Sequence, residues 1–282
     1  MNTKARVWLI TGVSTGFGRA LASAVLARGD EVIGTVRQPA QIAGFNALAS
    51  GRARGLQLDV TDRASIGPVI NQAVSDAGGL DVVVNNAGYG LFGAIEEISD
   101  AEARKVMETN FFGLMAVTQA ALPHLRARGG GNIVNVSSVA GFMGIPGCGL
   151  YCASKYAVEG FSESLALELA PFGIHVTIVE PSGFRTNFSG SSKNVAARTL
   201  AVYDNTPAGK TRGMIGAYHG HEPGDPALAA NAIITAVAAE KPPLRLLLGS
   251  DALSWARGKL SSLADNYEQW AAVTVATNLA SN

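Results

Sequence analysis

A tyrosine and a lysine stand four residues apart in the stretch Tyr151-Cys152-Ala153-Ser154-Lys155. Residues at i and i+4 lie on the same face of a helix, so the phenol and the ammonium are expected side by side. A free phenol has a pKa of about 10, too high for efficient proton transfer near neutral pH. A neighbouring cation favours the phenolate and lowers that pKa. The pair therefore predicts an acid–base centre, although the same spacing also fits an ordinary exposed pair on a helix.

Two serines precede this tyrosine. Ser137 and Ser138 follow the apolar run Asn132 to Val136, and a loop of residues 139–150 leads from them to Tyr151. Open α/β sheets bind ligands beyond the carboxyl ends of their parallel strands. We therefore expect a serine hydroxyl beside the phenol.

A glycine-rich turn, Thr11-Gly12-Val13-Ser14-Thr15-Gly16-Phe17-Gly18, lies between the first apolar run and a helical stretch. Glycines at such a junction allow a tight turn, a close approach of the backbone and close helix packing, while the helix N–H groups hold a pyrophosphate. The spacing Gly-x3-Gly-x-Gly differs from the commoner G-x-G-x-x-G. The turn predicts a dinucleotide site.

The same turn also matches G-x-S-x-G, the nucleophile elbow of serine hydrolases, with Ser14 as nucleophile. That elbow would lie on the first strand, with no earlier loop to supply an oxyanion donor. The late histidines, His219 and His221, lie in an irregular segment without a clear acidic partner. The hydrolase interpretation is the weaker one.

The end of the second apolar run indicates which dinucleotide is bound. An NAD enzyme places an acid there for the ribose hydroxyls. This chain instead reads Thr35-Val36-Arg37, and its acids Asp30 and Glu31 stand at the opposite end of the run. An arginine fork pairs with a 2′-phosphate. Arg37 predicts NADP(H).

Short apolar runs rich in β-branched residues alternate with Ala-rich stretches of helical period. Uniformly apolar short runs are typical of buried parallel strands, and their alternation with helices specifies right-handed βαβ units. The sequence thus predicts an α/β fold: a single-domain Rossmann doubly wound parallel sheet with helices on both faces. The expected strands are Val7–Ile10, Glu31–Val36, Gly55–Leu58, Val82–Asn85, Asn132–Val136, His175–Val179 and Leu244–Leu248. The expected helices are Arg19–Arg28, Arg63–Ala77, Ala101–Arg126, Tyr151–Ala170, Asp225–Ala239 and Asp251–Trp270.

The alternation breaks after Pro181. Residues 188–226 are rich in Gly, Ser, Asn and Pro without a sustained period, which predicts a substrate lid inside one domain of residues 1–282. Residues 251–282 are expected to form a C-terminal helical tail.

Composition narrows the function. The chain has 22 basic and 22 acidic residues, which argues against nucleic-acid binding. The longest early apolar run, Val7 to Ile10, is far shorter than a membrane span or a signal-peptide core. We therefore expect a soluble cytoplasmic protein with no membrane contact. No metal is expected, because Cys148 and Cys152 lack metal-ligand neighbours and the pair His219 and His221 lacks a third ligand.

The motifs together resemble the short-chain dehydrogenase/reductase family over about residues 5 to 250. Within it the chain most resembles NADP-preferring members related to 17β-hydroxysteroid dehydrogenases. The matching positions are Thr11-Gly12-x3-Gly16-x-Gly18, Asp59, Asn85-Asn86-Ala87-Gly88, Asn110, Ser138, Tyr151-x3-Lys155, and Pro181-x-Gly183 with Thr186.

This resemblance implies a catalytic set. Tyr151 would be the general acid in carbonyl reduction and the base in alcohol oxidation. Ser138 would hydrogen-bond the substrate oxygen. Lys155 would bind the nicotinamide ribose and lower the pKa of Tyr151, and Asn110 would hold a water that links Lys155 to solvent.

The resemblance also implies the dinucleotide contacts. Asp59 and Val60 would flank the adenine and Thr186 would bind the carboxamide, while Ser182 replaces a glycine often found after Pro181. The full implied set is Gly12, Ser14, Thr15, Gly16, Phe17, Gly18, Arg37, Asp59, Val60, Asn86, Ala87, Gly88, Tyr151, Lys155, Pro181, Gly183, Phe184 and Thr186.

Aromatic and apolar residues on the surrounding loops suggest a pocket for a hydrophobic ketone, aldehyde or alcohol, steroid-like or aromatic. The alternative is a cofactor-binding sensor or structural protein without turnover. Family members are often dimers or tetramers, so a homodimer or homotetramer is expected. The predicted pocket residues are Tyr89, Phe92, Phe142, Met143, Cys148, Phe184, Phe188, Met214 and Tyr218.

Overall fold

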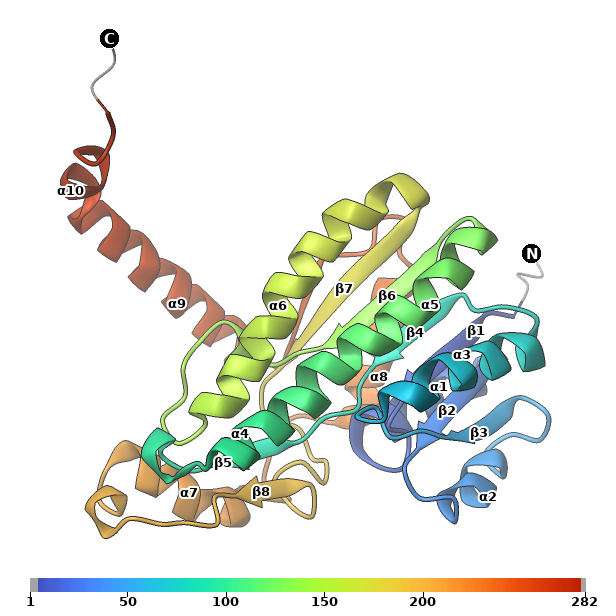
Figure 1. Cartoon of the computed structure of the whole chain (residues 1–282), viewed down its shortest axis with the longest axis horizontal. Coiled ribbons are helices and arrows are strands. Elements are labelled where there is room, and N and C mark those ends of the chain that lie inside the picture. Colours follow the sequence, from blue (N-terminus) through green and yellow to red (C-terminus); the bar gives the residue numbers. More distant parts are fainter. Residues whose placement is uncertain (1–4, 280–282) are drawn as a thin grey trace.

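Seven parallel strands form one sheet in the order β3-β2-β1-β4-β6-β7-β9 (Figure 1). The computed structural model describes residues 5–279. All seven predicted strands are present, and their bounds are β1 Val7–Thr11, β2 Glu31–Val36, β3 Ala53–Gln57, β4 Val82–Asn85, β6 Gly131–Val136, β7 Ile174–Pro181 and β9 Arg245–Leu248.

Helices cover both faces of this sheet. On one face α1 (Gly16–Ala27), α2 (Gln41–Asn46) and α8 (Pro226–Ala238) enclose one apolar core. On the other face α3 (Arg63–Ala77), α5 (Leu114–Arg128) and α6 (Gly149–Leu169) enclose a second. Burial on both faces explains why the central strands are apolar throughout. The doubly wound prediction is confirmed.

The long helix predicted over residues 101–126 has a break in its middle. It consists of α4 (Asp100–Met107), a π-helical turn η2 (Glu108–Gly113) and α5. A π-helical turn shifts the side chains that follow it and is frequent at functional sites. Here it carries Asn110.

The segment 188–226 is more ordered than its composition predicts. Strand β8 (Lys193–Val195) pairs in parallel with β5 (Gly90–Phe92), and the helix α7 spans Pro207–Tyr218. Contacts from distant parts of the chain supply this order. We call residues 188–226 the lid, and its role in covering a substrate stays a prediction.

One buried ion pair holds the lid on the body. Arg212 of α7 pairs with Glu97, whose side chain is fully buried, and with Asp204 at 2.6 Å. Glu97 also accepts hydrogen bonds from the N–H groups of Ala94 at 2.8 Å and Leu200 at 2.9 Å. It belongs to the short helix η1 (Ile95–Glu97), more than a hundred residues before its partner.

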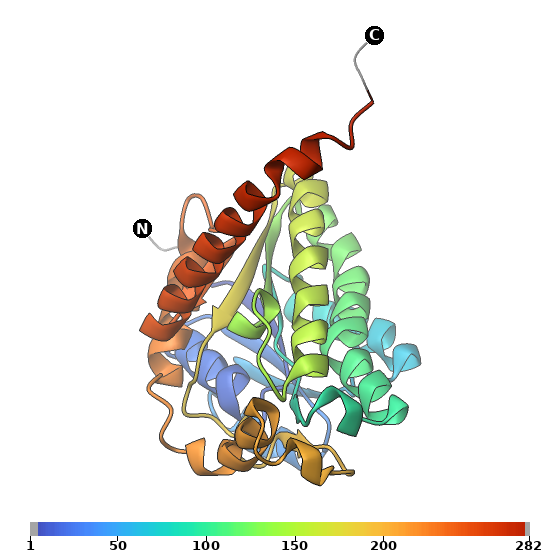
Figure 2. The ribbon, with the colours of Figure 1, turned by 90° about the vertical axis from the view of Figure 1, so that its left-hand side faces the viewer.

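The C-terminal tail forms α9 (Ser250–Gln269) and α10 (Ala271–Val275), which extend away from the body (Figures 1 and 2). Residues 280–282 of the predicted tail lie outside the described residues. Within residues 5–279, no helix is long and apolar enough to cross a membrane.

Candidate active site

The glycine-rich turn after β1 has the backbone that its glycines permit. Gly12 and Gly16 have φ values of 73° and 62°, a region that disfavours other residues. A Cβ on Gly18 would overlap the Gly12 carbonyl oxygen and lie 2.5 Å from Asn86 Nδ2. The start of α1 is thereby packed tightly against the turn.

The start of α1 fits an anionic ligand. Its first turn carries no acidic side chain, and the N-cap residue Thr15 makes no side-chain capping bond. Free N–H groups and the helix dipole attract phosphate at such a position. Gly16 faces Thr186: a Cβ added at Gly16 would lie 3.6 Å from the Cβ of Thr186. The cradle thus fits the pyrophosphate of a dinucleotide.

Thr11 ties this turn to the loop after β4. Its Oγ1 accepts hydrogen bonds from the N–H groups of Asn86 at 3.0 Å and Ala87 at 3.1 Å. In return, Asn86 Nδ2 donates to the carbonyls of Thr11 at 2.9 Å and Gly12 at 3.0 Å. Thr11 is part of the sequence motif, but the sequence analysis assigns it no role. Its position at the end of a strand is the signal that could have indicated this structural role.

Asn110 anchors the next part of the loop. Its Oδ1 accepts from the Tyr89 N–H at 3.0 Å, and its Nδ2 donates to the Tyr89 carbonyl at 3.0 Å and to Ser154 Oγ at 3.1 Å. A Cβ on Gly88 would lie 3.0 Å from Asn110 Oδ1 and 3.8 Å from Lys155 Nζ. The structure therefore brings Asn110, Gly88 and Lys155 together. Asn110 has a clear structural role, and the predicted water role stays a prediction.

Tyr151 lies in an apolar pocket at the start of α6. Its side chain is buried and packs against Phe188 of the lid, with 5.3 Å between ring centroids. Phe92 packs against Phe188 at 6.2 Å. The cluster around the phenol consists of Phe92, Ala140, Cys148 and Cys152, with Ile145, Phe188 and Ile215 packed against it.

Burial, not the lysine, dominates the pKa of Tyr151. Desolvation raises this pKa well above its ordinary value of 10, and a hydrogen bond with Ser138 lowers it only in part. The ammonium of Lys155 lies 5.8 Å from the centre of the phenol ring. Loss of hydration is therefore the largest effect on this pKa, and a lowering of it by Lys155 stays a prediction.

Lys155 is buried on the same face of α6. Its Nζ donates to the Val136 carbonyl at 2.8 Å. Burial lowers the pKa of Lys155 to about 8, and the charge of Glu159, one turn along the helix, opposes this fall. The ammonium is held where it can donate to a ligand near Gly88.

Ser138 stands at the end of β6 with its hydroxyl partly engaged. Its Oγ accepts from the Ala140 N–H at 3.2 Å and donates to the Pro181 carbonyl at 3.4 Å. A donor bond of that length is weak. The Ser138 hydroxyl can therefore give up its hydrogen bond to the Pro181 carbonyl and donate to a substrate oxygen instead. Ser138 also lowers the pKa of Tyr151, which places its side chain next to the phenol.

The sequence analysis missed a partly buried cluster of charged residues next to α6. Arg245 Nη1 pairs with Glu159 at 2.6 Å and with Glu180, and its Nη2 pairs with Glu163 at 2.6 Å. Burial and the neighbouring Glu159 raise the pKa of Glu180 to about 7. No sequence spacing joins these residues, because they come from α6, β7 and β9.

Other predicted dinucleotide residues lie around the same edge. Arg37, Ser14 and Thr15 are exposed, and Asp59 accepts from Thr61 Oγ1 at 2.8 Å. Val60 is buried against Gly113, whose Cβ would lie 2.8 Å from it. A contact of Val60 with adenine would therefore have to come from its backbone.

Phe184 was placed wrongly as a pocket residue. It packs on Phe17 at 5.1 Å and belongs to the core beneath α1 and α8, away from the cluster of Tyr151. Met214 is 67% exposed and lies outside this cluster, and its contact with a substrate stays a prediction. Its neighbour Ile215 packs against the cluster instead.

The remaining pocket predictions have mixed outcomes. Phe92, Cys148 and Phe188 meet at the phenol as predicted. Tyr218 instead lies with its hydroxyl next to Gly183 on the dinucleotide side. Phe142 and Met143 are half-buried on the loop that precedes α6, and Tyr89 is held by Asn110.

Two further sites are not supported by the geometry. In residues 5–279 no hydrogen bond joins Ser14 to a histidine, and His219 is 3.9 Å from Glu222. The described part of the chain also contains no group of three His, Cys, Asp or Glu side chains that could hold a metal ion.

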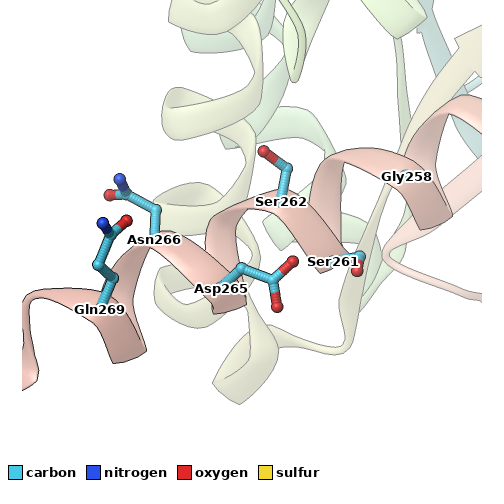
Figure 3. A pocket seen from close by; sticks show the side chains of 6 residues that line it. All are labelled: Gly258, Ser261, Ser262, Asp265, Asn266 and Gln269. Atoms are coloured by element: carbon cyan, nitrogen blue, oxygen red, sulfur yellow. The ribbon is translucent and has the colours of Figure 1, made fainter.

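An open surface hollow lies on helix α9, outside the site described above. It measures about 510 Å³ and is formed by α9 alone (Figure 3). Its lining residues are Gly258, Ser261, Ser262, Asp265, Asn266 and Gln269.

Comparison with known proteins gives a consistent picture. Residues 6–196 match the family model described as short chain dehydrogenase. The chain is 37% identical to "Oxidoreductase BOA17" of Botryotinia fuckeliana over 273 residues, 96% of this chain and 99% of that protein. It is 42% identical to "3-ketodihydrosphingosine reductase" of Bacteroides thetaiotaomicron over 194 residues, 69% of each chain.

A solved structure is similar throughout. A short-chain dehydrogenase from Streptomyces avermitilis is 43% identical and superimposes with a TM-score of 0.92, covering 99% of this chain and 100% of that one. The match includes the C-terminal tail.

Proposed function

This chain belongs to the short-chain dehydrogenase family and is an oxidoreductase, and from that premise we propose that it interconverts a hydrophobic ketone or aldehyde and its alcohol with NADP(H). Tyr151 is the acid–base residue of this reaction. The observation that carries the proposal is the meeting of the Tyr151 phenol, the Ser138 hydroxyl and the Lys155 ammonium at the mouth of an apolar cluster.

Ser138, Tyr151 and Lys155 each have a separate role in this reaction. Ser138 donates to the substrate oxygen, which places the carbonyl beside the Tyr151 hydroxyl. Tyr151 gives its proton to that oxygen in reduction and takes it back in oxidation. The nicotinamide, when bound, supplies or accepts the hydride. Lys155 holds the ribose and keeps a positive charge next to the phenol.

The pocket supplies groups that stabilise charge during the reaction. Tyr151 is protonated there, which is the form that donates a proton to a carbonyl oxygen. The charge that develops on the oxygen is stabilised by Ser138 and by the nearby ammonium, in a pocket from which Phe188 and Phe92 exclude water.

The apolar cluster sets the class of substrate. It offers aromatic and aliphatic side chains and two buried thiols. One similar protein is named for a keto group on dihydrosphingosine. A ketone carried on an apolar body fits this surface.

Arg37 supports the choice of NADP(H). Thr35 accepts hydrogen bonds from the N–H groups of Gly12 and Val13 at 3.0 Å, so the end of β2 lies beside the glycine turn. Arg37 follows directly and is exposed. We expect Arg37→Ala to raise the Michaelis constant for NADPH by about 10- to 100-fold, since one charge-assisted contact contributes about 1.5–3 kcal/mol.

The control for that experiment is Arg28→Ala, an exposed arginine at the far end of α1. It should leave both cofactors unaffected, and Arg37→Ala should leave NADH nearly unchanged. Equal losses for NADPH and NADH in Arg37→Ala would contradict the choice of cofactor.

A substrate panel tests the function as a whole. NADPH and NADH oxidation are followed with aliphatic, aromatic and steroid ketones and with small charged oxo-acids. The proposal predicts turnover of apolar ketones with NADPH. Turnover confined to the oxo-acids, or none with any carbonyl, would contradict it.

A further inference from the structure

Helix α9 leaves the body of the chain soon after it begins. Ala252 in its first turn is fully buried, and the helix packs there against β9 and η3 (Val139–Gly141). From there α9 extends outward with most of its side chains exposed (Figures 1 and 2). Helices in water owe most of their stability to the packing of an apolar face, so this one needs a partner along its length.

The apolar residues of α9 form a regular seam. Leu253, Ala256, Leu260, Leu263, Tyr267 and Trp270 follow one another at alternating spacings of three and four residues. That period of 3.5 residues is the pattern by which one helix packs along another.

Most of this seam is uncovered in the single chain. Leu260 and Tyr267 are 68% and 67% exposed, and Trp270 and Leu253 are 55% and 43% exposed. An exposed row of large apolar side chains on a polar helix is the mark of an interaction surface.

The opposite face of α9 is polar. Gly258, Ser261, Ser262, Asn266 and Gln269 line the open hollow on that side (Figure 3). Because small and polar side chains gain little from being covered, this face suits solvent. Because the apolar and polar residues lie on opposite faces of α9, the apolar seam is the face that a partner would cover.

The seam is complementary to itself when it is reversed. In an antiparallel pair, Leu260 of one helix opposes Leu263 of the other. In the same pairing Leu253 opposes Trp270 and Ala256 opposes Tyr267, so a small side chain meets a large one. A second copy of this chain therefore offers a matching surface.

Charge selects the same direction. Arg257 and Lys259 lie in the first half of α9, and Glu268 lies in its second half. An antiparallel pair places the basic half of each helix beside the acidic half of the other, whereas a parallel pair places like charges together. Antiparallel helix dipoles also attract. With 22 acidic and 22 basic residues, the chains carry no net charge to repel one another.

We propose that two copies of this chain form a homodimer through an antiparallel α9–α9 pair, with Leu260 and Leu263 at the two-fold axis. The seam from Leu253 to Trp270 is about 25 Å long, since a helix rises about 1.5 Å per residue. This inference is independent of the proposed reaction.

Sedimentation of the full chain tests the association. The wild type should be a dimer, and Leu260→Asp should be a monomer at the same concentration. Ser262→Asp places the same charge on the polar face and should stay dimeric. A monomeric wild type, or a dimer that survives Leu260→Asp, would overturn the proposal.

Disulfide trapping tests the direction without disturbing the fold. The native thiols Cys148 and Cys152 are buried, so an introduced cysteine on α9 is the reactive one. The double variant Leu260→Cys/Leu263→Cys should be trapped as a covalent dimer on oxidation. Leu253→Cys should not, because its two copies lie about 25 Å apart along the pair. Efficient trapping of Leu253→Cys would show a parallel pair and overturn the proposal.

Discussion

The dinucleotide side and the substrate side of this site are built in different ways. On the dinucleotide side, hydrogen bonds and close backbone contacts join Thr11, Gly12, Gly18 and Asn86, and all four lie within short motifs of the sequence. On the substrate side, Phe188 and Arg212 are held by residues that lie far away in the chain. The first kind of site is visible in a sequence because its geometry needs glycine. The second depends on contacts that only the folded chain reveals.

The largest expected effect is on the dinucleotide side. Gly18→Ala places a Cβ against the Gly12 carbonyl and the Asn86 amide, and neither can move without disturbing the hydrogen bonds of Thr11. We expect a loss of about 3 kcal/mol in unfolding free energy and a matching loss of NADPH affinity. Calorimetry and NADPH titration measure both.

Gly160→Ala is the matched control for this variant. No atom lies within 4 Å of its added Cβ, and Gly160 is inside α6. It should be neutral or stabilise the chain by up to about 1 kcal/mol. If Gly18→Ala bound NADPH like the wild type, the tight packing assigned to the turn would be wrong.

A nearly equal loss of stability is expected on the substrate side. There, however, ketone binding should weaken and NADPH binding should not. Arg212→Met leaves the buried Glu97 carboxylate without its cation, which costs about 3 kcal/mol. Since Arg212 belongs to α7, the loss should loosen the lid and raise the Michaelis constant of the ketone. NADPH affinity should stay nearly unchanged.

The control is Arg104→Met, which removes an ion pair whose arginine is 77% exposed and which should change stability by less than about 1 kcal/mol. If Arg212→Met weakened NADPH binding as much as ketone binding, the dinucleotide side and the substrate side would not be structurally independent, and the comparison would be contradicted.

A smaller effect concerns the cluster of charged residues next to α6. Glu180 has a pKa raised to about 7 in the folded chain, against 4.5 for an ordinary glutamate. Its contribution to stability is therefore complete below about pH 4.5 and is lost as pH rises through about 7. The loss is at most about 3 kcal/mol, because each pKa unit corresponds to about 1.4 kcal/mol.

Glu180→Gln should remove this pH dependence. Its unfolding free energy should fall less than that of the wild type between pH 5 and pH 8, as measured by urea denaturation. Glu163→Gln changes an exposed carboxylate on the same Arg245 and should keep the wild-type slope. Parallel curves for Glu180→Gln and the wild type would contradict the raised pKa.

The sequence predicts the part of the fold that follows from local chemistry. All seven strands of the sheet and its winding are recovered, because buried parallel strands read as apolar runs. It also predicts that Ser138 and Tyr151 meet, since strand ends and helix starts gather at one edge of a parallel sheet.

The features that the sequence analysis does not predict depend on contacts between residues far apart in the chain. The order of the lid depends on Glu97, and the place of Phe184 depends on Phe17 and α8. The pKa of Tyr151 was predicted from a neighbour at i+4 alone, whereas burial by Phe188 and the loop before α6 has the larger effect. Desolvation is a property of the whole fold, so no local spacing reveals it.

Single-turnover reduction tests the central claim most directly. Wild-type and Tyr151→Phe enzymes are loaded with NADPH and mixed rapidly with an apolar ketone that the panel identifies, and the loss of NADPH is followed. We predict that Tyr151→Phe binds NADPH but transfers hydride about 10²- to 10⁴-fold more slowly, because the carbonyl oxygen lacks its proton donor. Transfer at the wild-type rate would show that the phenol is not the acid and would contradict the account.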